Sequence, residues 1–133
     1  MAAYTRVNLK SDVQDMAPKF GMEGIESHFA RTNLELENSG LSLYRLDGGY
    51  RTPFGHTHSK QEEVYVVVSG SARIAVDDEV VDLSQWDAIR IPSGAMRAME
   101  AGDDGAEILA FGAPNTDNKD ADLTQDWWPE GAS

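Results

Sequence analysis

The chain contains no cysteine. This absence excludes disulfide bonds, thiolate nucleophiles and zinc–thiolate sites. Long apolar runs are also missing. No segment approaches the length needed to span a membrane, and the opening stretch MAAYTRVNLK does not contain the apolar core of a signal peptide. These features predict a cytoplasmic protein.

Basic residues are scarce, since 11 lysines and arginines face 23 aspartates and glutamates, for a formal net charge of −12. A surface this acidic repels phosphate backbones and anionic lipids. We therefore expect neither nucleic acid nor a membrane as a partner. The length of 133 residues is enough for one domain with a hydrophobic core.

The composition changes along the chain. Residues 1–24 are mixed and polar and predict a short N-terminal extension, with a short helix over residues 11–16. Residues 25–113 alternate short β-rich runs with turn residues, such as EEVYVVVSG, SARIAV and DAIRIP. Short strands at this spacing are typical of an all-β barrel or sandwich rather than of βαβ units.

Residues 114–133 form an acidic tail that is polar apart from a leucine and the pair Trp127 and Trp128. One interpretation is a mobile tail. The other is that part of it packs on the barrel or on a neighbouring subunit, because exposing both tryptophans to water is unfavourable.

The stretch GHTHSKQEEVYVVVSG contains the residues with the clearest chemistry. His56 and His58 lie one residue apart, so on a strand their side chains point to the same face. Glu63 shares a strand face with Tyr65, and both faces of that strand are apolar. A carboxylate pointing into such an interior is costly unless it is paired or binds a metal. Two imidazoles and one carboxylate suit a first-row divalent cation such as Zn, Fe, Mn or Ni.

The same stretch resembles the first motif of the cupin superfamily, G-x5-H-x-H-x3,4-E-x6-G. The matching residues are Gly49, His56, His58, Glu63 and Gly70, with one extra residue after Gly49. The resemblance covers about residues 40–112. It implies a single-domain cupin-type β-barrel, or jelly roll, that pairs into a homodimer, with the two tryptophans as one candidate to cover part of the interface.

The second cupin motif, G-x5-P-x-G-x2-H-x3-N, is matched only in part. Pro92 and Gly94 agree with it, but Trp86 stands in place of the first glycine and is expected to pack on a hairpin corner. Arg97 stands where the third ligand histidine belongs. The remaining histidine, His28, lies outside both motifs and joins the site only if its strand reaches the pocket.

The arginine changes the expected chemistry, because a guanidinium has no acceptor lone pair and cannot bind a cation. Arg97 is expected to enter the barrel and form a bidentate pair with Glu63. It also weakens metal binding, since at ~5 Å it would repel a divalent cation by several kcal/mol at an effective dielectric of about 20.

Three interpretations of the pocket follow. Arg97 replaces the metal, and the pocket binds a small polar or anionic molecule through Arg97, Tyr65, His56 and His58. Alternatively, His56, His58 and Glu63 still hold a divalent metal, as in a cupin dioxygenase or a sugar-phosphate isomerase or epimerase. In the third, the cluster is a structural relic in a scaffold for dimerisation. We favour the small-molecule binder with little or no metal, and no motif selects a catalytic residue.

Overall fold

The computed structural model describes residues 3–115 and 120–129. One short 3-10 helix precedes the strands. The elements in chain order are η1 (Ala17–Phe20), β1 (Ile25–Phe29), β2 (Gly40–Leu46), β3 (Phe54–His58), β4 (Glu62–Val76), β5 (Glu79–Leu83), β6 (Ala88–Ile91), β7 (Arg97–Ala113) and β8 (Ala121–Gln125). Within the described ranges, no helix is long and apolar enough to span a membrane.

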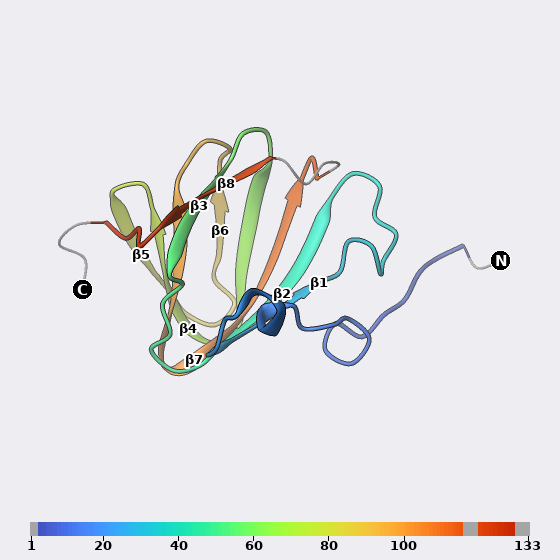
Figure 1. The fold of residues 1–133 in the computed structure, drawn as a ribbon, viewed down its shortest axis with the longest axis horizontal. Coiled ribbons are helices and arrows are strands. Elements are labelled where there is room, and N and C mark those ends of the chain that lie inside the picture. Colours follow the sequence, from blue (N-terminus) through green and yellow to red (C-terminus); the bar gives the residue numbers. More distant parts are fainter. Residues whose placement is uncertain (1–2, 116–119, 130–133) are drawn as a thin grey trace.

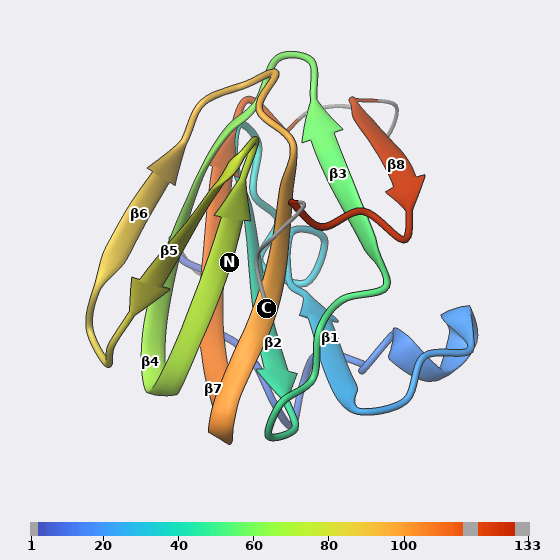
Figure 2. The ribbon, with the colours of Figure 1, turned by 90° about the vertical axis from the view of Figure 1, so that its left-hand side faces the viewer.

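All strand pairs are antiparallel, and the strands join into one sheet that curls around a core. The path β1-β2-β7-β3-β8 forms one part, while β4 pairs with β5, β6 and β7. β7 connects the two parts of the sheet, because it pairs with β2, β3 and β4. Figure 2 shows β4, β5 and β6 on one side and β3 and β8 on the other. The all-β barrel expected from the sequence is confirmed.

The core lies on the concave side of the sheet, where strand alternation places apolar side chains. On β4, Tyr65 and Val67 are buried, whereas the intervening valines are half-buried on the outer face. Ile74 from the same strand and Ile108 from β7 complete this core, both with no exposed surface. The pairing of β4 with β7 shifts register on either side of Ser69 and Gly70, which bends both long strands around the core.

The expected helix over residues 11–16 is wrong. The side chain of Asn8 accepts the backbone N–H groups of Lys10 and Ser11 and closes a turn instead. The backbone that follows is held by β1, since Met16 N–H donates to the carbonyl of Ser27. The helix begins only at Ala17, with a proline in its first turn.

The tail is part of the sheet, so the barrel continues past residue 113. β8 pairs with β3 over five residues, and Figure 1 shows the two strands side by side. Trp127 packs so closely over Gly55 that a Cβ there would lie 2.5 Å from the indole ring. Trp128 lies beneath Arg51, whose guanidinium carbon is 4.0 Å from the ring centroid. In the structure, residues 120–129 pack on the barrel; tail residues 116–119 and 130–133 lie outside the described ranges.

Trp86 does not pack on a hairpin corner, because 69% of its surface is exposed. Its backbone φ is +72°, in the left-handed region that glycine adopts without strain. This explains why the cupin motif has glycine at this position. Gly94, which does match the motif, has a φ of +86°, and its N–H donates to the carbonyl of His58.

Candidate functional site

A cavity of about 640 Å³ opens into the barrel. Most of its wall is apolar and comes from residues before β1, from β1, β2, β3, β7 and β8, with members such as Met22, Ile25, Phe29, Tyr44, Phe54, Met99 and Leu123. One cluster of ionisable and polar side chains is formed by His56, His58, Gln61, Glu63 and Tyr65, and further uncharged polar side chains line other parts of the wall: Ser27, Ser42, Thr52, Asn115 and Gln125. The cavity therefore combines a large apolar surface with scattered uncharged polar groups and one cluster that carries the ionisable ones.

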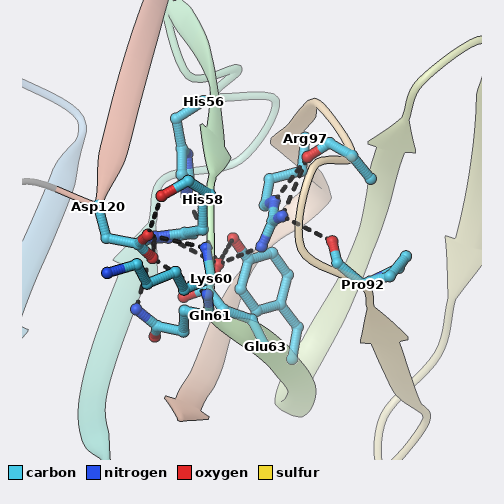
Figure 3. A network of polar contacts seen from close by, with 11 residues as sticks. His56, His58, Lys60, Gln61, Glu63, Pro92, Arg97 and Asp120 are labelled. Carbon is cyan, nitrogen blue, oxygen red and sulfur yellow. Dashed lines mark hydrogen bonds and ion pairs between the residues drawn. The ribbon is translucent and has the colours of Figure 1, made fainter. Parts of the chain in front are cut away.

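The polar cluster arises because β3 and β4 present their side chains to the same interior. His56 and His58 lie on one face of β3, with their rings edge to face and 5.0 Å apart. Their Nε2 atoms are 3.5 and 3.4 Å from Oε1 of Glu63 on β4. One ligand atom from each of the three residues lies within 4.8 Å of the others. Figure 3 shows the three side chains converging.

Glu63 is ionised in this environment although its side chain is only 12% exposed. Burial alone would raise the pKa of Glu63. The adjacent imidazoles of His56 and His58 outweigh burial and hold the pKa well below its usual value of 4.5. The cluster therefore presents a carboxylate, which is the form that binds a cation.

Arg97 lies beside this carboxylate and is fully buried, with 0% exposure. Its Nη1 donates to Oε1 of Glu63 at 2.7 Å, while Nη2 donates to the carbonyls of Pro92 and Ala95 and Nε donates to Ala95. The ion pair expected from the sequence is present, but the expected bidentate geometry is wrong. The two backbone carbonyls compete for the rest of the guanidinium.

Arg97 is not among the residues that line the cavity. The side chain supports Glu63 from the protein interior. His28 does not reach the cluster either: it is buried on β1, with Nδ1 2.8 Å from the carbonyl of Val13 and Nε2 3.0 Å from Glu26.

Tyr65 and Tyr44 are part of the cavity wall. The hydroxyl of Tyr65 donates to Oε1 of Glu63 at 3.3 Å. Burial raises the pKa of both phenols above the usual value of 10. Both therefore remain neutral at physiological pH, and each can offer a hydroxyl to a ligand.

Sequence analysis missed Asp120, which lies next to His58 although it is 62 residues away in the chain. Its Oδ2 is 3.2 Å from Nδ1 of His58. The same carboxylate accepts hydrogen bonds from the hydroxyl of Ser59 and from the backbone N–H groups of Lys60 and Gln61. Only the pairing of β8 with β3 brings the two residues together, so no local pattern in the sequence could have found Asp120.

The donor atoms of this cluster fit a first-row divalent cation. Neutral imidazole and carboxylate are ligands that zinc, iron, manganese and nickel all accept. His56, His58 and Glu63 could hold a metal together because their ligand atoms lie close to one another. Arg97 occupies one lone-pair direction of Glu63 Oε1 and adds a positive charge behind that ligand. The residues thus fit a metal site with three protein ligands and a reduced affinity.

A family model described as a cupin domain matches residues 42–112. The chain belongs to the cupin family. A relative, the uncharacterized protein SCO3923 of Streptomyces coelicolor, is 31% identical over 84 residues, which is 62% of this chain and 78% of the relative. Its name gives no activity.

Solved structures with the same fold include proteins that differ widely in sequence. A cupin protein from Bacteroides fragilis superposes with a TM-score of 0.70 at 24% identity, covering 86% of this chain and 87% of the other. KdgF from a Halomonas species gives 0.68 at 20% identity, covering 89% and 98%. A variant of Streptomyces PAC13 with uridine gives 0.73 at 15% identity, covering 96% and 95%. At these identities the likeness establishes the cupin fold alone.

Proposed function

We propose that this cupin binds a small molecule with an apolar body and a polar end inside the barrel. His56, His58 and Glu63 contact the polar end, either directly or through a weakly held divalent cation. The observation that carries this proposal is the cavity of about 640 Å³, whose apolar wall meets one polar cluster. Cavities that bind small molecules commonly have volumes of about 300–1,000 Å³ and this distribution of polar groups.

The charges on the cavity wall narrow the ligand class. Among the described lining residues there is one carboxylate, Glu63, and no lysine or arginine. Glu63 is paired with the buried Arg97, so the pair presents little net charge to the cavity. An uncharged polar ligand is therefore favoured over a free anion. A carboxylate or phosphate would find no unpaired positive charge among these lining residues, and a cation at the cluster would supply one.

Thermal-shift measurements with two probe sets test this proposal. We expect uncharged amphiphilic compounds, such as nucleosides and phenols, to raise the Tm in EDTA, and small carboxylates to raise it only when zinc is added. The variant Ser42→Trp fills the cavity, since Ser42 lines it, and is expected to abolish both responses. Glu79→Trp, at an exposed position on β5 outside the cavity wall, is the matched control. Equal responses in the two variants would contradict binding in the barrel.

A second candidate function is a metal-dependent enzyme, such as a dioxygenase or a sugar-phosphate isomerase or epimerase. The arrangement of two imidazoles and one carboxylate within 4.8 Å favours it. A bound divalent cation would act as a Lewis acid on a ligand oxygen, while Tyr65 would hold a proton near Glu63. Elemental analysis of protein purified without a histidine tag separates the candidates. Stoichiometric metal that is lost in His56→Ala favours the enzyme, and metal-free protein favours the binder.

The homodimer and the cytoplasmic location also remain proposals. The exposed apolar side chain of Phe111 on β7 supports an interface between two copies. The half-buried Trp127 and Trp128 pack on their own barrel and so offer less surface to a partner. Sedimentation of wild type and Phe111→Glu tests the interface, and a monomeric wild type would contradict it.

A further inference from the structure

His58 lies between two carboxylates, and each of its ring nitrogens faces one of them. Nδ1 is 3.2 Å from Oδ2 of Asp120, and Nε2 is 3.4 Å from Oε1 of Glu63. Figure 3 labels the three residues and marks these contacts with dashed lines. A neutral imidazole has one N–H and one lone pair, so it can donate to only one of the two oxygens.

The geometry selects which nitrogen carries the proton. The contact between Nδ1 and Asp120 has hydrogen-bonding geometry at 3.2 Å and is shorter than the 3.5 Å contact of the same nitrogen with Nε2 of Gln61. The contact of Nε2 with Oε1 of Glu63 is longer than that with Asp120, at 3.4 Å, and Oε1 already accepts hydrogen bonds from Arg97 and Tyr65. A proton on Nδ1 therefore makes the shorter hydrogen bond, to Asp120, and leaves the lone pair of Nε2 directed at the cluster. The opposite tautomer would lose the hydrogen bond to Asp120.

We propose that Asp120 is a positioning residue that holds His58 with Nδ1 protonated and leaves Nε2 free to bind a cation. This inference rests on the part of the proposed function in which the cluster binds a divalent metal. Carboxylates that hydrogen-bond the outer nitrogen of a ligand histidine fix its ring and its tautomer and raise its basicity. Asp120 does this from the position directly before β8, outside the two motifs that carry the cluster.

Asp120 is itself held firmly, which a positioning role requires. Oδ1 accepts from Ser59 Oγ and from Lys60 N–H, and Oδ2 accepts from Gln61 N–H in addition to His58. Both oxygens are therefore needed. An asparagine would present an NH₂ group either to His58 and Gln61 or to Ser59 and Lys60. The structure thus predicts that Asp120→Asn loses part of the network although its shape is unchanged.

The first test compares the zinc affinity of Asp120→Asn with that of Asp122→Asn. Asp122 lies on β8, two residues after Asp120, and is exposed, so the same chemical change there is the matched control. We expect zinc binding, measured by competition with a chelator, to weaken about 10- to 100-fold in Asp120→Asn and less than about twofold in Asp122→Asn. Equal affinities in the two variants would overturn the proposal. Circular dichroism confirms that both variants are folded before the comparison.

The second test reads the tautomer directly by NMR of the ¹⁵N-labelled imidazole groups in metal-free protein. We expect a proton on Nδ1 of His58 in the wild type and in Asp122→Asn, exchanging slowly because Asp120 accepts it, and fast exchange in Asp120→Asn. An unprotonated Nδ1 in the wild type would refute the proposal. This readout needs no metal, so a protein that binds no zinc but shows the expected tautomer contradicts the metal-binding function and supports the positioning role.

Discussion

The variant Arg97→Met tests how much the buried ion pair of Arg97 and Glu63 contributes to the stability of the barrel. Methionine fills much of the same space but has no donor. The substitution leaves the carboxylate of Glu63 and the carbonyls of Pro92 and Ala95 without the N–H groups that they accept now. Glu63 is 12% exposed and Arg97 is 0% exposed, so water replaces these contacts poorly.

The expected loss of stability follows from these contacts. Removing one partner of a buried ion pair costs about 3–5 kcal/mol, because the other charge remains buried without its partner. That is a large part of the 5–15 kcal/mol that roughly spans the stability of domains. We therefore expect urea denaturation in EDTA to show a lower midpoint, with a free energy of unfolding reduced by about 3–5 kcal/mol.

Arg90→Met is the matched control for this prediction. Arg90 on β6 is 62% exposed, and its nearest carboxylate, Glu62, is 3.9 Å away. A pair this exposed contributes little, so we expect a change of about 0.5 kcal/mol or less. If Arg97→Met were no less stable than Arg90→Met, the argument that Arg97 holds Glu63 in the interior would be refuted. A double-mutant cycle with Glu63→Gln then measures the coupling directly.

Three further predictions concern pH, Trp86 and the tail. The pKa of Glu63 is lowered in the folded state, so the stability that the ionised carboxylate contributes is present above its usual pKa of 4.5 and is lost as the pH falls. Acid should therefore destabilise the wild type more than Glu63→Gln, when urea midpoints in EDTA are compared at pH 6 and 3.5. Trp86→Gly relieves the strain of a positive φ at an exposed position, so it should leave the Tm unchanged or raise the free energy of unfolding by up to about 1 kcal/mol. A clear loss of stability would mean that the indole makes stabilising contacts. Trp128→Ala removes the ring 4.0 Å from the guanidinium of Arg51 and should cost about 1–2 kcal/mol in chemical denaturation, while Trp128→Phe retains most of it.

The sequence by itself was enough for the fold class and for three of the cluster residues. The short β-rich runs separated by turn residues are a local property, and they predicted an all-β barrel or sandwich; the resemblance to the cupin motif then selected the barrel. His56 and His58 share a face of one strand because side chains alternate along a strand. The spacing from His58 to Glu63 and Gly70 matched a known motif, which brought Glu63 to the cluster. Arg97 was correctly expected beside Glu63, because its position in the second motif points into the barrel.

Predictions from the local sequence pattern were wrong where contacts with other parts of the chain competed with the expected structure. The turn closed by Asn8 replaced the helix expected over residues 11–16, because the backbone of Met16 pairs with β1. The guanidinium of Arg97 was expected to bind Glu63 with two hydrogen bonds. It makes one, since the carbonyls of Pro92 and Ala95 accept the others.

Only the tertiary structure decided what surrounds the cluster. The segment ADLTQ has only two apolar residues, Ala121 and Leu123, which is too weak a pattern to predict a strand, and it becomes β8 by pairing with β3. That pairing places Asp120 against His58 across 62 residues of sequence. It also brings Leu123 to the wall of the cavity and Trp127 onto Gly55. Strand alternation is encoded within a few neighbouring residues, whereas the choice of partner strand depends on the free energy of the whole fold.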